Sequence, residues 1–336
     1  MTLYWHALKQ RTEELLSPAL RNDLVELIAG GFSPGGIDEL GRLTFGSYSS
    51  HEIAGEDSHI TISRRRAAGL LVEQAHTRSL FPKIIRLIAE LDGGVFLGKK
   101  LTIPGIEGFF NSLARVGIVY DPTRRRLHHT REDIRKLKNW GTLRDGRSYD
   151  VSVVSVDIVG NSLLVRDHGA KAMEALYYQL HTFLDRKLSE YDGRVWNWAG
   201  DGGILAFAFS GHVDRAVKCA IDIQTSLPLF NISSDNPIGR HIALRTAVDT
   251  GKVRFYSDTG RIVSEVINYA AHLEKAATQP GTVSISHRAQ LGTDPKILSI
   301  FEDGGFFEGA PYVKTPRRLD LLFPDAEGCE EDEATA

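Results

Sequence analysis

The chain has 336 residues, a formal net charge of −3, 42% hydrophobic residues and 25% charged residues. Its length indicates about two domains, and its charge gives no overall attraction to nucleic acid or to an anionic membrane. The two cysteines, Cys219 and Cys329, are too few for a disulfide framework, and no apolar run is long enough for a membrane-spanning helix, so we expect a cytoplasmic protein.

The N-terminal part carries apolar residues at helical spacing, interrupted by glycine and proline. The expected helices cover residues 13–30, 37–45, 65–79 and 82–91. We therefore expect a small all-α helical domain over residues 1–95. This helix pattern resembles the effector-associated adaptor modules of bacterial conflict-system proteins, which implies a protein partner bound through these helices. The alternative is a helical cap on the domain that follows.

Residues 96–148 are expected to form a connector. Ile106–Val116 fits a helix, Gly117–Tyr120 a strand, Arg124–Arg126 a basic turn and Arg131–Trp140 a second helix. Helix, strand and basic turn are also the parts of a winged-helix DNA reader. Acidic residues interrupt the basic run, however, so we favour a solvated connector and expect no nucleic-acid partner.

From residue 149 the pattern changes to alternating strands and helices in the order βαββαβ, which predicts an α+β, ferredoxin-like domain over residues 149–324. The expected strands cover residues 151–157, 194–199, 204–209, 242–248, 283–286 and 318–323, and the expected helices cover residues 171–191, 212–227 and 263–277. The acidic tail, residues 325–336, is expected to be disordered.

Two short segments of this domain place an aspartate beside glycine at the edge of an apolar strand. Asp157 lies in Val154–Gly160, and Asp201 lies in Ala199–Phe207. The intervening residues fit one helix and a hairpin, so both side chains could point to one cleft. Two converging carboxylates are a common way to hold Mg²⁺ against substrate phosphates. The pair therefore predicts phosphoryl-transfer chemistry.

Two further motifs follow the aspartates in order. The four motifs are Asp157–Gly160, Gly200–Gly202, Arg245 with Asp249–Gly251, and Asn268–Glu274. With these motifs in register, residues 149–291 resemble the class III nucleotidyl cyclase homology domain of adenylate and guanylate cyclases. The resemblance implies two Mn²⁺ or Mg²⁺ ions per site, held by Asp157, Asp201 and the Ile158 carbonyl. It also implies phosphate binding by Arg245 and Lys314.

The resemblance assigns the remaining roles to positions that depart from the purine pattern. Asn268 matches the asparagine that orients the ribose, whereas Asn197 and Arg261 stand where the family reads the base, and His272 replaces the transition-state arginine. An amide both donates and accepts, so Asn197 suits the edge of uracil or cytosine. The chain thus resembles the pyrimidine cyclases of bacterial anti-phage signalling, with UTP favoured over CTP as substrate.

The resemblance further implies a homodimer, because family sites form at a two-fold interface. One subunit would supply the two aspartates, and its partner would supply Asn197, Arg261, Asn268 and His272. Two alternatives remain open: an adenylate- or guanylate-type cyclase, and a nucleotide-binding signalling module without catalysis.

Overall fold

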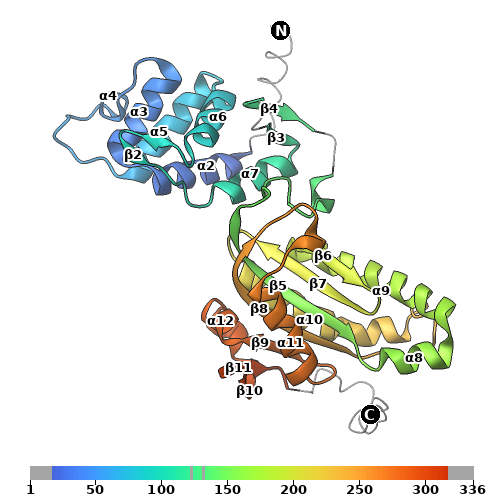
Figure 1. Ribbon diagram of the computed structural model, residues 1–336. Coiled ribbons are helices and arrows are strands. Elements are labelled where there is room, and N and C mark those ends of the chain that lie inside the picture. The colour runs from blue at the N-terminus through green and yellow to red at the C-terminus, as the bar shows by residue number, and fades with distance from the viewer. Residues whose placement is uncertain (1–16, 122–123, 131–132, 317–336) are drawn as a thin grey trace. The chain divides into compact units, whose positions relative to one another are not determined.

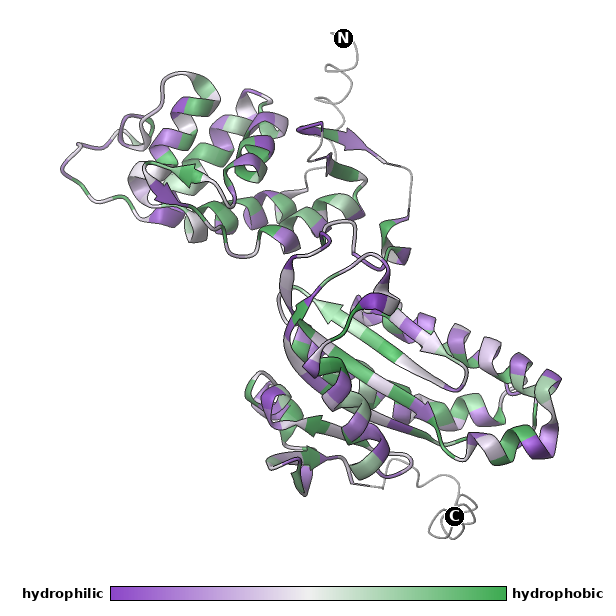
Figure 2. Cartoon of the chain, viewed as in Figure 1, coloured by the Kyte–Doolittle hydropathy of each residue, from purple (hydrophilic) through white to green (hydrophobic). Residues whose placement is uncertain are grey.

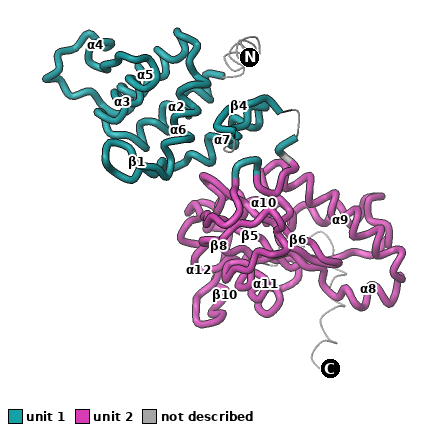
Figure 3. The backbone as a smooth tube through the Cα atoms, turned by 45° about the horizontal axis from the view of Figure 1, so that its top comes forward, with its two compact units in different colours: residues 1–134, 140–142 teal, residues 135–139, 143–336 magenta. Residues whose placement is uncertain are grey.

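The computed structural model describes residues 17–121, 124–130 and 133–316, which fall into two compact units (Figure 3). Unit 1 comprises residues 1–134 and 140–142, and unit 2 comprises residues 135–139 and 143–336. The expected strand over residues 318–323 and the acidic tail lie outside the described residues. No helix in the described part of the chain is long and apolar enough to cross a membrane.

Unit 1 is mainly helical over its described residues. Its helices are α2 (Pro18–Gly31), α3 (Pro34–Phe45), α4 (Ser50–Ala54), α5 (Arg64–Thr77), α6 (Phe81–Leu91) and α7 (Ile106–Arg115). Serine starts several of them: Ser17 and Ser33 each precede a proline and accept a hydrogen bond from a first-turn amide, at 3.3 and 3.2 Å. The predicted helices correspond to α2, α3, α5, α6 and α7, and only the short α4 was not predicted.

Unit 1 also contains two hairpins, which apart from Val95 lie in the predicted connector over residues 96–148 and not in the predicted all-α domain over residues 1–95. They are β1 (Val95–Phe96) with β2 (Lys99–Lys100), and β3 (Ile118–Asp121) with β4 (Arg126–His129). The predicted basic turn lies in the second hairpin. There Arg124 lies 3.7 Å from Asp121, and Arg125 lies 2.9 Å from Glu90. These pairs lie within unit 1 and fit the solvated surface that the sequence favoured over a DNA reader.

The predicted connector over residues 96–148 is wrong for most of its length. Ile103, Phe109 and Leu127 are buried in the same core as the N-terminal helices, because the apolar face of α7 completes that core. The predicted helix Arg131–Trp140 is also wrong: its described residues hold a single 3-10 turn, Ile134–Lys136 (η1). The carbonyl groups that follow this turn accept bonds from strand β6 instead of from a helix.

Unit 2 is built on one seven-stranded sheet with the order β10-β11-β9-β8-β5-β7-β6 (Figure 1). Its strands are β5 (Ser148–Ile158), β6 (Arg194–Ala199), β7 (Gly202–Ala208), β8 (Leu244–Arg254), β9 (Val283–Ser286), β10 (Glu302–Phe307) and β11 (Ala310–Lys314). The four strands β8-β5-β7-β6 pair antiparallel. With α9 between β5 and β6 and α10 between β7 and β8, they confirm the predicted ferredoxin-like βαββαβ order.

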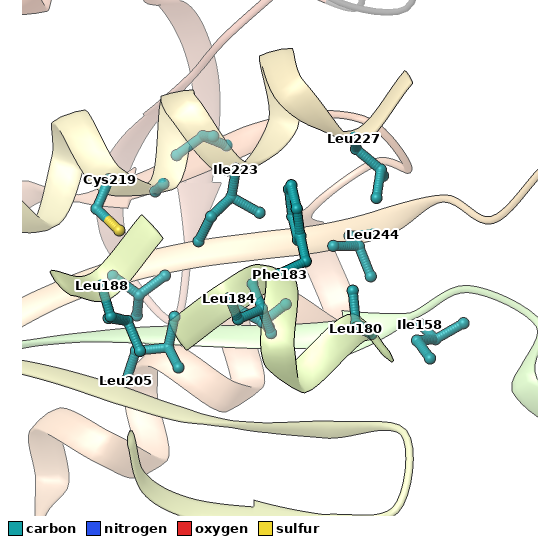
Figure 4. Packing of buried hydrophobic residues seen from close by; sticks show 14 of the residues in the cluster. Ile158, Leu180, Phe183, Leu184, Leu188, Leu205, Cys219, Ile223, Leu227 and Leu244 are labelled. Carbon is teal, nitrogen blue, oxygen red and sulfur yellow. The ribbon is translucent and has the colours of Figure 1, made fainter. Parts of the chain in front are cut away.

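The helices of unit 2 divide between the two faces of the sheet. They are α8 (Asn161–His168), α9 (Ala170–Tyr191), α10 (His212–Ile232), α11 (Glu265–Ala277), α12 (His287–Leu291) and α13 (Pro295–Leu298). Helices α9 and α10 bury their apolar residues on one face, where Phe183, Ile223 and Leu244 converge (Figure 4). Helix α11 packs on β5 and β8 from the other face. Figure 2 shows the hydrophobic strands between these amphipathic helices.

Alternation along β5 decides which side chains face α11. Val154, Val156 and Ile158 belong to the core beneath α9 and α10. Since successive side chains of a strand point to opposite faces, Asp157 points to the α11 face. The sequence thus positions a carboxylate on the sheet face against which α11 packs.

Candidate active site

Asp157 lies at the end of β5, opposite Gly202 on β7 and Arg245 on β8. Nη2 of Arg245 donates to Oδ2 of Asp157 at 2.8 Å. Burial raises the pKa of Asp157, and the charge of Asp201 raises it further, while the bond from Arg245 opposes the rise. Asp157 is thus a partly buried carboxylate that a positive charge would stabilise.

Asp201 occupies the tight turn between β6 and β7. Its carbonyl oxygen accepts a hydrogen bond from the amide of Ile158 at 3.2 Å, which joins this turn to the end of β5. The next residue, Gly202, leaves room for this approach: a Cβ there would lie 2.7 Å from the Val156 carbonyl and 2.8 Å from Oδ1 of Asp157. The two predicted metal-binding aspartates and Ile158 therefore meet at the C-terminal end of β5.

Arg245 bridges Asp157 to a second acid, Glu274 on the inner face of α11. Nε of Arg245 donates to Oε1 of Glu274 at 2.9 Å, and the Glu274 side chain is 8% exposed. Burial, followed by the charge of Asp157, raises the pKa of Glu274 from 4.5 to about 7, although Arg245 opposes the rise. No role was predicted for Glu274 from the sequence, although Ala270 and Leu273 mark the buried face of α11 on which it lies.

The donor set suits an ion that arrives with a phosphorylated substrate. The described part of the chain holds no cluster of three or more His, Cys, Asp or Glu side chains that could bind a metal by itself. Mg²⁺ commonly takes one or two protein carboxylates and fills its other positions with water and substrate phosphates. Asp157 and Asp201 supply that minimum, so the residues fit Mg²⁺ or Mn²⁺ bound together with a triphosphate.

The two predicted base-reading residues lie on elements that bond to each other. Asn197 is exposed on β6 and follows Trp196, where the register of β6 shifts. Arg261 is exposed at the end of the 3-10 turn Thr259–Arg261 (η2), with its guanidinium carbon 5.7 Å from the ring centre of Tyr256. The hydroxyl of Thr259 donates to the carbonyl of Trp196. This bond brings the segment of Arg261 to the strand of Asn197.

Asn268 and His272 lie on the exposed side of α11, away from the aspartates. Nδ1 of His272 lies 3.1 Å from Oε1 of Glu308, and the His272 side chain is 66% exposed. At 100° per residue, His272 and Glu274 point about 160° apart around the helix axis. Because Glu274 points to Arg245, a single chain does not bring His272 to the site of Asp157.

Lys314 is also remote from the aspartates within one chain. It ends β11, opposite Glu302 on β10 and Ser284 on β9. Strands β9 and β8 separate β11 from β5 in the sheet. The structure therefore unites Asp157, Ile158, Asp201 and Arg245 at one place, and leaves Lys314 outside that group.

Comparison with known proteins gives likenesses of fold alone. No family model matches the chain. No curated protein matches it either. Similar solved structures include the guanylate cyclase domain of RhGC from Catenaria anguillulae in complex with GTP, at 17% identity, a TM-score of 0.42, and coverage of 50% of this chain and 96% of that one. Another is the adenylyl cyclase CyaB from P. aeruginosa, at 20% identity, a TM-score of 0.43, and coverage of 50% and 93%.

Proposed function

We propose that the chain is a metal-dependent nucleotidyl cyclase that converts a nucleoside triphosphate into a 3′,5′-cyclic mononucleotide and pyrophosphate. The observation that carries the proposal is that Asp157, Asp201 and Arg245 lie close together at the C-terminal end of β5. Two carboxylates that can hold divalent ions, beside one guanidinium, suit a reaction in which the substrate supplies both reacting groups.

In this reaction the ribose 3′-oxygen bonds to the α-phosphorus, and the bond from that phosphorus to the bridging oxygen of the β-phosphate breaks. The leaving group is pyrophosphate, and the proton of the 3′-hydroxyl is released to water. Divalent ions at Asp157 and Asp201 would supply charge neutralisation for the 3′-oxygen and the leaving pyrophosphate. Arg245 would exchange its bond to Asp157 for phosphate oxygens while Glu274 holds its Nε. The chain's own residues thus position and neutralise the substrate.

We infer a homodimer from the two sides of α11. Glu274 on the inner side belongs to the metal site, while Asn268 and His272 point outward, so one chain alone cannot bring all these groups to one triphosphate. A second copy related by a two-fold axis would offer its Asn268 and His272 to the first copy's aspartates. Val263, just before α11, is 85% exposed and adds apolar surface that a second copy would cover.

The base we propose is a pyrimidine, UTP ahead of CTP. Asn197 and Arg261 support this choice, since an exposed amide and a guanidinium can donate to O2 and O4 of uracil, and the amide can accept from N3–H. An adenylate- or guanylate-type preference remains the alternative outcome of the assay.

The testing assay incubates the purified chain with Mn²⁺ and ATP, GTP, CTP or UTP in turn, and measures cyclic product and pyrophosphate. We expect one pyrimidine product from the wild type and from Asp150→Ala, which changes an exposed aspartate elsewhere in β5. Asp157→Ala should form none. Binding of a triphosphate without any product would favour the non-catalytic module, and absence of binding would refute both readings.

Complementation tests the dimer. Asp157→Ala damages the site of its own subunit, whereas Asn268→Ala would damage the site of its partner. Mixing two inactive variants in equal amounts should restore about a quarter of the wild-type activity, because half of the dimers are mixed and each mixed dimer keeps one intact site. Two variants that stay inactive in the mixture, despite exchanging subunits, would exclude shared sites.

We also propose that the cyclic nucleotide serves anti-phage signalling in the cytoplasm, with unit 1 binding an adaptor-type protein partner. The supporting observation is that unit 1 has a core of its own, as a separate interaction module requires. Phage infection should raise the cyclic nucleotide in cells that carry the wild type, and should not do so in cells that carry Asp157→Ala.

A further inference from the structure

We propose that Lys138 is a positioning residue for base recognition, because its amino group ties the strand of Asn197 to the turn of Arg261. This inference rests on the function proposed above. Lys138 lies in residues 135–139, the short segment that belongs to unit 2 although its sequence neighbours on both sides belong to unit 1.

The tether consists of reciprocal bonds within unit 2. Nζ of Lys138 donates to the carbonyl oxygen of Trp196 and to Oγ1 of Thr259, both at 3.1 Å. The indole Nε1 of Trp196 donates back to the carbonyl oxygen of Lys138 at 3.1 Å. Thr259 also donates to the Trp196 carbonyl, so these three residues form one connected network.

The network joins β6 at a point where the regular ladder is interrupted. The register of β6 against β7 shifts between Val195 and Asn197, so Trp196 is the extra residue of a bulge. Its side chain is 1% exposed and packs on Phe255, at 5.9 Å between ring centres. A bulge carbonyl requires a partner outside the ladder, and Lys138 and Thr259 supply it.

The backbone around Lys138 is held independently of the amino group. Nε of Arg194 donates to the carbonyl of Leu137 at 3.1 Å, next to the bond from Trp196 to Lys138 itself. Removing the amino group should therefore leave the segment in place and remove the two bonds that Lys138 adds between β6 and η2, while the direct bond from Thr259 to Trp196 remains.

The predicted consequence concerns the base and not the phosphates. Asn197 is one residue from Trp196, and Arg261 is two residues from Thr259. The tether therefore sets the spacing between an amide and a guanidinium that would contact one base. Arg245 and Asp157, which would contact the triphosphate, take no part in the network.

The test compares Lys138→Met, which keeps the aliphatic stem, with Lys136→Met, an exposed lysine of η1. The probes are the 3′-deoxy forms of ATP, GTP, CTP and UTP with Mn²⁺, which lack the attacking hydroxyl, and inorganic triphosphate. We expect Lys138→Met to reduce the preference for the best base over the others by about three- to tenfold, as for the loss of one or two hydrogen bonds. Affinity for inorganic triphosphate should not change, and Lys136→Met should bind like the wild type.

A second variant covers the case in which Lys138→Met does not fold. Thr259→Val removes the hydroxyl but keeps the shape of a side chain that is 6% exposed, and it should reduce the same preference. An unchanged preference in the folded variants, or an equal loss for all four bases, would overturn the role of Lys138 while leaving the cyclase proposal intact. A wild type that binds none of the nucleotides would instead refute the cyclase proposal, and this inference with it.

Discussion

The buried carboxyl of Glu274 should make the protein less stable at pH 8 than at pH 5, and Glu274→Gln should remove that loss. Burial raises the pKa of Glu274 from 4.5 to about 7 in the folded chain. A group whose pKa is raised by folding stabilises the protein fully below its unfolded pKa, and this contribution is lost as the pH rises through the folded pKa. The contribution of Glu274 to stability should therefore be lost between pH 4.5 and about 7.

The size of the effect follows from the same values. A rise from 4.5 to about 7 at 1.36 kcal/mol per pH unit gives about 3 kcal/mol as the upper limit. Glutamine is neutral at every pH, has nearly the same shape, and still offers Oε1 to Nε of Arg245. At pH 8 the variant should therefore be up to about 3 kcal/mol more stable than the wild type, and within about 1 kcal/mol of it at pH 5.

Urea unfolding in EDTA, followed by tryptophan emission at the two pH values, measures this difference. The matched control is Glu265→Gln on the same helix, because Glu265 is 83% exposed and pairs with Arg288 at 2.7 Å. We expect no pH-dependent gain from the control. A Glu274→Gln variant that is no more stable than the wild type at pH 8 would show that Arg245 fully compensates the burial of the Glu274 charge.

Three further outcomes test the site and its surroundings. Gly202→Ala should weaken Mn²⁺ binding in the presence of triphosphate by about tenfold or more, because the added Cβ would lie 2.8 Å from Oδ1 of Asp157. The control Gly260→Ala should bind Mn²⁺ like the wild type, because its Cβ would lie 3.5 Å from the nearest atom. Calorimetry measures Mn²⁺ binding by both variants. Glu308→Gln should lower kcat and leave KM unchanged, because it removes the charge beside Nδ1 of His272; an equal change in KM would contradict this. In a Cys329→Ser background, Cys219 should react with a thiol reagent only on unfolding, since its side chain is fully buried and burial raises its thiol pKa.

The sequence predicted the framework of unit 2 because its strands and helices have clear periods. The middle of β5 is a nearly continuous apolar run that is buried on both faces, and the buried residues of the long helix α9 recur at helical spacing. The short helices α4 and α8 were not predicted, because five or eight residues show too little of a helical repeat. The boundary between units also escaped, because the apolar face of α7 indicates burial without indicating which core it joins.

The candidate site was predictable where a strand end and a glycine turn fixed the backbone. Asp157, Asp201 and Arg245 meet because of strand pairing, which the order of motifs already implied. Glu274 escaped because a charged residue on a helix is ordinarily exposed, and only the cation across from it explains its burial. Lys138 escaped because its segment was expected to be helical, and its partners lie 58 and 121 residues away along the chain.

The two sides of helix α11 carry residues with different proposed roles. Its inner side holds Arg245 through Glu274, and its outer side carries Asn268 and His272, which the proposed dimer would present to the other site. The chain reaches this helix directly from η2, with Ser264 capping its first turn a few residues after Arg261. Helix α11 therefore follows η2 closely along the chain, and it carries groups that the proposed dimer would assign to two different sites. In a dimer of this design, variants that loosen the Lys138 tether should change base preference, whereas variants of Asp157 or Asp201 should weaken metal binding and turnover without changing base preference.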